Sequence, residues 1–245
     1  MENKNLLNKF IERLALPSKI TISLPENDQR ILDASVILKD IGLNIVGSND
    51  IEIAGGDYLL FLKKLKFSSN WPEEKLAEYI SNPFIKALCM LRDDRVDGIV
   101  SGCTIPTSDV LRGALRIIGL KSSSKWLSSM FLMVDQKSDN VITFADCAVI
   151  PEPNSEQLVE IAFEAAQIHK NITGDEAAIA FLSFSTKGSA KHYRVKVVQD
   201  AVKIFQKRNH GFLHEGEIQL DAALDINISN KKLNHSILKG NANIL

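Results

Sequence analysis

The stretch from Asp97 to Arg112 holds the residues of this sequence with the clearest chemical potential. It reads Asp-Gly-Ile-Val-Ser-Gly-Cys-Thr-Ile-Pro-Thr-Ser-Asp-Val-Leu-Arg. The pattern predicts a buried strand over 98–101, a loop, and a helix that Thr107 or Ser108 can cap. The N–H groups of a first helical turn attract anions, and a guanidinium adds charge-assisted hydrogen bonds. The stretch therefore predicts an oxyanion or phosphate site, with an ordinary strand-to-helix turn as an equally weighted alternative.

A second polar loop spans residues 183–191, between a buried apolar run and a helix. Ser185, Thr186 and Lys187 stand beside Gly188, whose backbone can approach a ligand closely because it has no Cβ. The loop lacks the glycine spacing and the Gly-Lys-Ser/Thr ending of a nucleotide-binding P-loop. It is a second candidate anion site, and a plain polar loop explains it equally well.

Other polar residues have weaker claims to chemistry. A neighbouring carboxylate such as Asp146 disfavours the thiolate that nucleophilic chemistry needs, so we interpret Cys147 as packing and Asp146 as a structural hydrogen-bonding residue. The pair Glu215 and Glu217 lacks the histidines that favour a metal site, so we expect solvated strand ends. The histidines are scattered and are expected at the surface: His169, His192, His210, His214 and His235. No metal site is predicted.

The elements that must position these residues alternate between strand and helix. Strands are predicted over 19–24, 44–47, 98–101, 126–134, 140–145 and 177–184, with a last strand or turn beginning at Glu217. Helices are predicted over 6–14, 30–41, 73–79, 83–91, the residues after the first loop, 154–168 and 195–205. In the helix over 30–41, the inward residues are expected to be Ile31, Ala34, Ile37, Leu38 and Ile41.

This alternation predicts an α/β fold with mostly parallel sheets. The prolines of the Pro151-Glu-Pro-Asn break predict two domains, residues 1–150 with the phosphate loop and residues 151–245. The final residues, 239–245, end on apolar, strand-like positions.

Composition limits the classes of function. The 245 residues are 45% hydrophobic and 24% charged, as in a globular protein with a sizeable core. The net charge of -1 gives no general attraction to nucleic acid or to an acidic membrane, so neither is an expected partner. Three widely spaced cysteines and the lack of a signal-like segment favour reduced thiols in the cytoplasm.

Six segments, in order along the chain, resemble phosphate acetyltransferase. They are Leu24-Pro-Glu, Asp97-Gly-Ile-Val-Ser-Gly, Thr107-Ser-Asp-Val-Leu-Arg-Gly-Ala-Leu, Phe144-Ala-Asp-Cys-Ala-Val, Leu182-Ser-Phe-Ser-Thr-Lys-Gly-Ser-Ala and Glu215-Gly-Glu-Ile-Gln-Leu-Asp-Ala-Ala. The resemblance runs to Gly240-Asn-Ala-Asn and covers essentially the whole chain. Phosphate butyryltransferase is a related family, and the segments at 144 and 182 favour the acetyl enzyme.

The resemblance implies reversible acetyl transfer between acetyl phosphate and coenzyme A. It also implies two α/β domains of the isocitrate/isopropylmalate dehydrogenase kind, with the active site in the cleft between them. No cofactor or metal is implied, because coenzyme A is a substrate. A cytoplasmic homodimer is expected.

Substrate-binding residues follow from the same resemblance. Arg112 matches the family's substrate arginine, with Thr107 in the phosphate pocket, and Arg30 matches an arginine linked to coenzyme A. Lys63 stands where the family has a further arginine, and it keeps the charge but loses the two-pronged grip on phosphate. The full expected set is Arg112, Thr107, Ser108, Thr104, Arg30, Lys63, Ser185, Thr186 and Lys187.

The family's principal catalytic groups lie after its Gly-Asn-Ala-Asn motif, in an Asn-Asp-Leu-Ser-Arg-Gly segment and a following aspartate. This sequence has no match to them, so its catalytic residues stay unassigned. We expect a truncated chain with an incomplete N-terminal domain, whose activity is impaired unless a second polypeptide supplies the segment. The alternatives are a non-catalytic or decayed fragment that retains a phosphate or coenzyme A site, phosphate butyryltransferase, and, most weakly, a dehydrogenase of the isocitrate dehydrogenase architecture.

Overall fold

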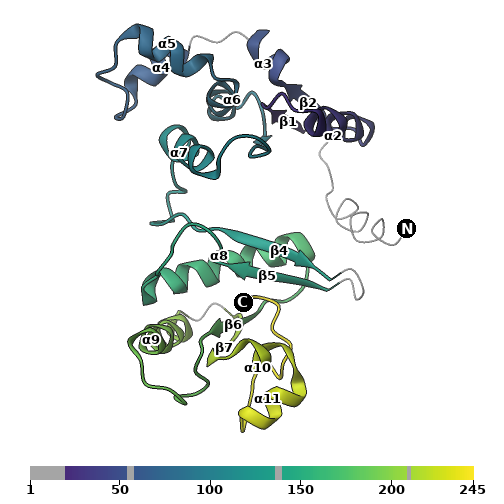
Figure 1. Cartoon of the computed structure of the whole chain (residues 1–245), viewed down its shortest axis with the longest axis vertical. Coiled ribbons are helices and arrows are strands. Elements are labelled where there is room, and N and C mark those ends of the chain that lie inside the picture. The colour runs from purple at the N-terminus through teal and green to yellow at the C-terminus, as the bar shows by residue number, and fades with distance from the viewer. Residues whose placement is uncertain (1–19, 54–57, 136–139, 209–210) are drawn as a thin grey trace. The chain divides into compact units, whose positions relative to one another are not determined.

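The computed structural model describes residues 20–53, 58–135, 140–208 and 211–245 (Figure 1). The chain forms two compact units, a first unit of residues 15–121 and a second unit that contains residues 122–245. The sequence places residues 122–150 with the N-terminal domain, whereas the structure groups them with the C-terminal residues.

The helix expected over 6–14 lies outside the described residues. Within the described ranges, no helix combines the length and apolar character that a bilayer crossing needs.

The first unit is built on a three-stranded parallel sheet in the order β2-β1-β3. These strands are β1 (Thr21–Leu24), β2 (Asn44–Gly47) and β3 (Gly98–Ile99). Both neighbours run parallel to β1, with Thr21 opposite Asn44 and Ile22 opposite Gly98. The carboxyl ends of β1 and β3 therefore lie at one edge of the sheet, where open α/β folds bind ligands.

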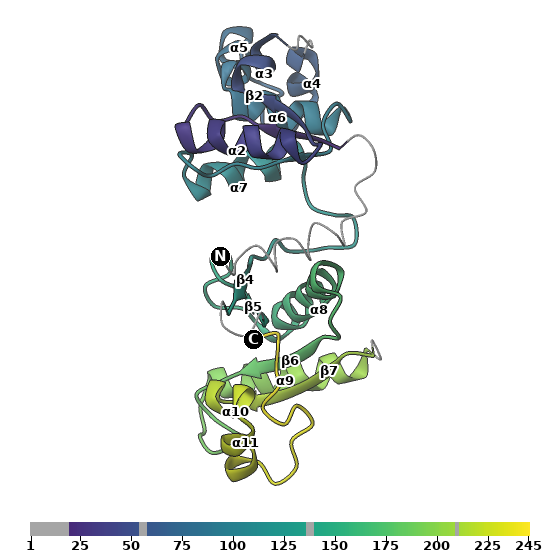
Figure 2. The ribbon, with the colours of Figure 1, turned by 90° about the vertical axis from the view of Figure 1, so that its right-hand side faces the viewer.

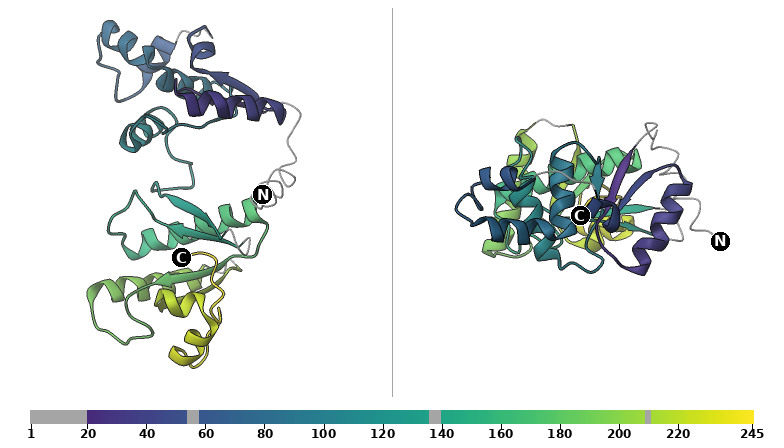
Figure 3. Two further views of the ribbon diagram at one scale, coloured as in Figure 1. Left: turned by 45° about the vertical axis from the view of Figure 1, so that its right-hand side comes forward. Right: turned by 90° about the horizontal axis from the view of Figure 1, so that it is seen from above.

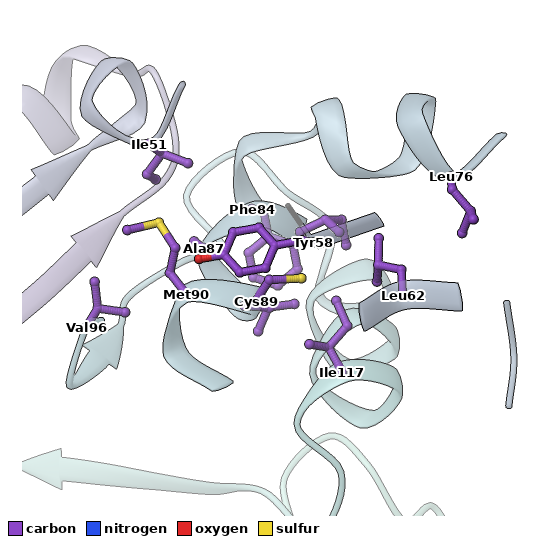
Figure 4. Packing of buried hydrophobic residues seen from close by; sticks show 12 residues of the cluster. Ile51, Tyr58, Leu62, Leu76, Phe84, Ala87, Cys89, Met90, Val96 and Ile117 are labelled. Carbon is purple, nitrogen blue, oxygen red and sulfur yellow. The ribbon is translucent and has the colours of Figure 1, made fainter. Parts of the chain in front are cut away.

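Helices surround this small sheet and supply most of the first core. They are α2 (Gln29–Asp40), α3 (Ser48–Ile53), α4 (Tyr58–Lys64), α5 (Glu73–Ser81), α6 (Pro83–Arg92) and α7 (Thr107–Ile117). Helix α6 contributes a nearly continuous buried run from Phe84 to Met90, against which Leu62, Leu76 and Ile117 pack (Figure 4). α6 is therefore the support on which α7 lies.

Helix α2 departs from its expected burial. The sequence predicts five inward residues, yet no residue of α2 is buried, and Ile37 and Ile41 are exposed. The helix contacts β2. The expected Ile31, Ala34 and Leu38 are half-buried, whereas Leu32 and Val36 are exposed. The apolar spacing correctly predicts that this segment is a helix, but it does not predict how far the apolar side chains are buried.

The second unit contains β4 (Met130–Val134) and β5 (Val141–Ala145), paired antiparallel, and β6 (Ala178–Leu182) and β7 (Leu213–Ile218), paired parallel. Ile244 forms parallel bridges to both Thr143 in β5 and Ile179 in β6. The C-terminal residues thus join the two strand pairs into one sheet, as their strand-like sequence suggests (Figure 1). This pairing explains why residues 122–150 belong to the second unit.

Strand β6 buries both of its faces, because its alternate side chains enter different cores. Ile179 and Phe181 pack with α8 (Ser155–Thr173) and α9 (Tyr193–Lys207). Ala180 packs with α10 (Leu220–Leu224) and with residues near the end of the chain. Helix α11 (Ile226–Lys232) follows α10 along the chain (Figures 2 and 3). The continuous apolar run that predicted a doubly buried strand is therefore confirmed.

Three further expectations need correction. Strand β7 ends just after Glu217 rather than beginning there, and Glu215 and Glu217 are buried within it instead of being solvated. His169 is fully buried rather than superficial, because it faces the sheet from α8 and its Nδ1 lies 2.8 Å from Thr143 Oγ1. The predicted strand over 126–134 begins only at Met130.

Asn154 caps α8, as the sequence predicts. Its side chain accepts a hydrogen bond from Gln157 N at 2.9 Å, and Gln157 Oε1 accepts one from Asn154 N at 3.0 Å. We expect Asn154→Ala to lower the free energy of unfolding by about 1 kcal/mol, because the backbone N–H of Gln157 loses its side-chain acceptor. Urea titration measures the change, with Asn171→Ala on the exposed surface of the same helix as the control. Equal losses in the two variants would contradict the capping role.

Candidate functional site

The loop after β3 is closed around a carboxylate of the chain itself. Glu26 lies just beyond β1 and is buried, and its two carboxylate oxygens accept hydrogen bonds from four successive backbone N–H groups. The distances are 3.1 Å from Gly102, 2.8 Å from Cys103, 3.2 Å from Thr104 and 3.1 Å from Ile105. Gly102 has a φ of +108°, which a glycine adopts most easily. We call this arrangement the Glu26 nest.

The nest changes how the first candidate site must be interpreted. Successive inward N–H groups form the concavity that proteins use to bind phosphate, as the sequence pattern suggested. Here those donors already hold Glu26. Burial acts to raise the pKa of Glu26, but the four backbone hydrogen bonds outweigh it and hold that pKa below the usual value of 4.5. The loop amides are therefore occupied by a permanent anion, and Thr104 offers only its side chain to a ligand.

This lowered pKa predicts how stability depends on pH. A carboxylate whose pKa falls on folding stabilises the native state above its unfolded pKa, and that contribution is lost as pH falls through the folded value. We expect the melting temperature of Glu26→Gln to lie below that of the unchanged protein at neutral pH and the gap to shrink below about pH 4.5. Thermal melts between neutral and acid pH measure it. A gap that stays constant throughout this range would contradict the ionised nest.

Helix α7 begins two positions after Ile105, the last donor of the nest, and its first turn is open. The N-cap position is Pro106, which has no side-chain capping bond, so the prediction that Thr107 or Ser108 caps the helix is wrong. Both lie inside the helix and are exposed. Among the described residues, neither their backbone N–H groups nor their hydroxyls have a hydrogen-bond partner. These donors, unlike those of the nest, are available to an anion.

Arg112 projects from the second turn of α7. Its side chain is half exposed, and its guanidinium lies 2.6 Å from Asp109 Oδ1. A cavity of about 410 Å³ between α5, α6 and α7 has Arg112 in its wall. One carboxylate cannot saturate a guanidinium with five N–H donors, so Arg112 keeps donors for a phosphate. The expected residues Arg112, Thr107 and Ser108 therefore share one short helical segment beside a cavity.

Sequence reasoning missed two further cations in the wall of this cavity. Arg116 lies over the ring of Phe67 at 5.1 Å, and Lys75 lies over Trp71 at 4.2 Å. Neither has a carboxylate partner within the described part of the chain. The signal was present, since Arg112 and Arg116 are four residues apart and share a helix face. The aromatic partner of Arg116 was not predictable, because Phe67 comes from a distant segment of the chain, whereas Trp71 precedes Lys75 by only four residues.

Arg30 and Lys63 lie elsewhere in the first unit. Arg30 is paired with Asp28 at 2.8 Å at the start of α2, and this pair lowers the pKa of Asp28 to about 2. Electrostatic coupling also links Arg30 with Cys103 and Glu26, which places it beside the nest. Lys63, at the end of α4, is exposed and lies 3.7 Å from Glu73. Lys63 does not line the cavity beside Arg112.

The second candidate loop is also closed by an internal carboxylate. Glu217 Oε1 accepts from Gly188 N at 2.6 Å and from Ser185 Oγ at 3.0 Å. The hydroxyl of Thr186 accepts from Gln219 N at 3.1 Å, so both hydroxyls that the sequence singled out are engaged. These bonds explain why Glu217 is buried, and they leave this loop with fewer free donors than the first turn of α7.

Lys187 is held by the same strand. Its Nζ donates to Gly216 O at 3.0 Å and lies 3.4 Å from the buried Glu215. Asp146 accepts from Ser129 Oγ at 2.6 Å and from backbone N–H groups of Ala148 and Val149, which confirms its structural role. At Ser185, Thr186 and Lys187, the expected positions in the second unit, the hydroxyls and the ammonium group are therefore already engaged by the protein.

Thiol and metal chemistry find no support in the described residues. Burial raises the pKa of the Cys89 thiol to about 12 and also raises that of Cys103, so neither thiol is activated as a nucleophile. Within the ranges that the structure describes, His, Cys, Asp and Glu side chains form no group of three or more suited to hold a metal ion. The site is therefore built from hydroxyls, backbone donors and guanidinium groups.

Comparison with characterised sequences points to one family. The phosphate acetyl/butaryl transferase pattern matches residues 10–245. A phosphate acetyltransferase from Thermoanaerobacterium thermosaccharolyticum is 33% identical over 98% of this chain and 82% of its own length. One from Clostridium acetobutylicum is 39% identical over 70% of this chain, an alignment that spans about half (53%) of that relative.

Solved structures agree. A phosphotransacetylase from Streptococcus pyogenes superposes with a TM-score of 0.86 at 28% sequence identity, covering 100% of this chain and 81% of that chain. The mixed α/β fold with parallel strands is therefore shared with phosphotransacetylases. The family pattern covers far more than half of the chain, and a relative above 30% identity covers most of both sequences. The chain belongs to the phosphate acetyl/butaryl transferase family.

Proposed function

We propose that this chain binds acetyl phosphate and coenzyme A for reversible acetyl transfer. In that reaction the thiol sulfur of coenzyme A forms a bond to the acetyl carbon, the bond from that carbon to the phosphate oxygen breaks, and the thiol proton leaves to a base or to the released phosphate. The protein must position the phosphate and stabilise the charge that develops on the carbonyl oxygen.

One observation carries the proposal: the open first turn of α7 is followed on the same helix by Arg112, which lies in the wall of a cavity. The N–H groups and hydroxyls of Thr107 and Ser108 offer donors to phosphate oxygens, and Arg112 adds charge. Arg116 and Lys75 make the same cavity more basic. We assign these residues to the phosphate-bearing substrates, with Arg30 and Lys63 as further candidates for coenzyme A.

A second candidate function is phosphate binding without transfer. Three carboxylates of the segments around the open turn are engaged: Glu26 by four N–H groups, Asp28 by Arg30 and Asp109 by Arg112. None of these three is a free general base. Because thiolate attack needs the thiol proton to be removed, this observation favours a binding role over rapid turnover by these residues alone.

The remaining assignments are also part of the proposal. We assign the two units to the two domains of an isocitrate/isopropylmalate dehydrogenase-like architecture, with no metal or cofactor. We assign the chain to the cytoplasm, as a homodimer or with a second chain. Transfer of an acetyl rather than a butyryl group rests on the acetyltransferase relatives.

The test follows thioester formation by the purified chain from acetyl phosphate and coenzyme A, together with calorimetric titration of each substrate. Acetyl transfer with saturation in both substrates supports the enzyme. Binding of acetyl phosphate without transfer supports the second candidate, and absence of both binding and transfer contradicts the proposal. Butyryl phosphate, compared in the same assay, measures the acyl preference.

A further inference from the structure

Glu26 occupies a place that a substrate phosphate fills in many proteins. Four inward N–H groups in succession are suited to an anion, and each bond from 2.8 to 3.2 Å goes to one buried carboxylate. An anionic substrate cannot enter the same concavity, because its donors are used and the resident charge repels a second one. The loop 102–105 is therefore a closed structural feature rather than the phosphate site itself.

The nest also ties together the segments that carry the candidate residues. Glu26 precedes Asp28, the N-cap of α2, by two residues, and Asp28 holds Arg30. On the other side, Ile105 precedes Thr107 by two residues, so its N–H bond to Glu26 fixes the entry to α7. A single carboxylate thus sets where the α2 start and the α7 start lie relative to one another.

We infer that Glu26 is a positioning residue for the phosphate site, an internal anion that shapes the loop and directs the substrate phosphate to the open first turn of α7. This inference rests on the proposed function for the identity of the phosphate ligand. Glu26 touches neither substrate nor reacting atoms. It acts through the backbone of residues 102–105 on the placement of Thr107 and Ser108.

Removing the negative charge of Glu26 should weaken phosphate binding, although Glu26 does not itself contact the phosphate. In Glu26→Gln the shape is kept, but the amide NH₂ faces N–H donors and the charge-assisted bonds are lost. We expect the Kd of inorganic phosphate, measured by calorimetry, to rise by about tenfold to a hundredfold, because the loop that positions Thr107 and Ser108 loses its anchor. Glu74→Ala, at an exposed glutamate of α5, is the control and should keep the original Kd.

A rescue experiment separates positioning from general destabilisation. Glu26→Ala leaves the four N–H groups without their anion, and formate is small enough to replace the carboxylate. We expect added formate to raise the melting temperature of Glu26→Ala and to restore part of its phosphate affinity. Chloride at the same ionic strength should do neither. The unchanged protein and Glu74→Ala should show no formate effect on melting.

The outcomes distinguish this inference from the proposed function. Rescue by formate with recovery of phosphate affinity supports the positioning role, whether or not acetyl transfer is observed. An unchanged phosphate Kd in Glu26→Gln overturns it, and so does formate rescue of melting without any recovery of phosphate affinity. Absence of phosphate binding in the unchanged protein overturns both, whereas missing acetyl transfer with intact phosphate binding overturns only the enzyme proposal.

Discussion

Arg112→Met should weaken the binding of acetyl phosphate by about 1.5–3 kcal/mol, or tenfold to 150-fold in Kd, the usual range for a hydrogen bond to a charged group. Arg112 is half exposed, lies at the wall of a 410 Å³ cavity, and follows the open turn of α7. Methionine keeps much of the side-chain length but removes all guanidinium donors. Calorimetric titration of acetyl phosphate measures the change.

A matched control is available in the second unit. Arg208 is likewise half exposed and lies 2.6 Å from a single carboxylate, that of Glu160. Arg208→Met removes a comparable ion pair at the end of α9. Arg208 belongs to the second unit, whereas the open turn of α7 belongs to the first. We expect its acetyl phosphate affinity to be unchanged. Equal losses in the two variants would mean that Arg112 acts through general charge or stability and not through contact with phosphate.

Phe205→Ala should cause the largest loss of stability, about 3–5 kcal/mol, because a fully buried aromatic side chain leaves a cavity. Phe205 lies on α9 and contacts the ring of Phe181 with centroids 5.3 Å apart, in the core between α9 and the sheet. Urea unfolding measures the free energy. The fold of the second unit therefore depends on this contact more than on any surface ion pair.

The control for this core is Leu213→Ala. Leu213 begins β7 near the same core but is 53% exposed, so its truncation opens no buried cavity. We expect a loss well below that of Phe205→Ala. If both variants unfold at the same urea concentration, the core assigned to α8, α9 and β6 is not the main source of stability in this unit.

Local signals in the sequence predicted local structure well. The capping residue Asn154 and the apolar runs of β6 and α6 define elements whose order and type are confirmed. The division of the chain between the units was not predictable in the same way. It depends on Ile244, which bridges β5 and β6. The bridge from Ile244 to Thr143 joins residues about a hundred positions apart in the sequence, which no local pattern indicates.

The candidate site shows the same limit. Small residues and Gly102 indicated an anion-binding loop, and the loop does bind an anion. That the anion is Glu26 depends on β1 and β3 lying side by side, which no short motif states. The sequence also indicated Arg112 but not Arg116 or Lys75. These two cations line the same cavity and lie over the rings of Phe67 and Trp71.

The central claim is that the first turn of α7, and not the nest, receives the substrate phosphate. Competition calorimetry tests it most directly, with acetyl phosphate titrated into the chain in the presence and absence of inorganic phosphate. The account predicts one saturable site that inorganic phosphate competes for and that Ser108→Ala and Arg112→Met weaken. Affinity that survives both substitutions, or the absence of any saturable site, would contradict it.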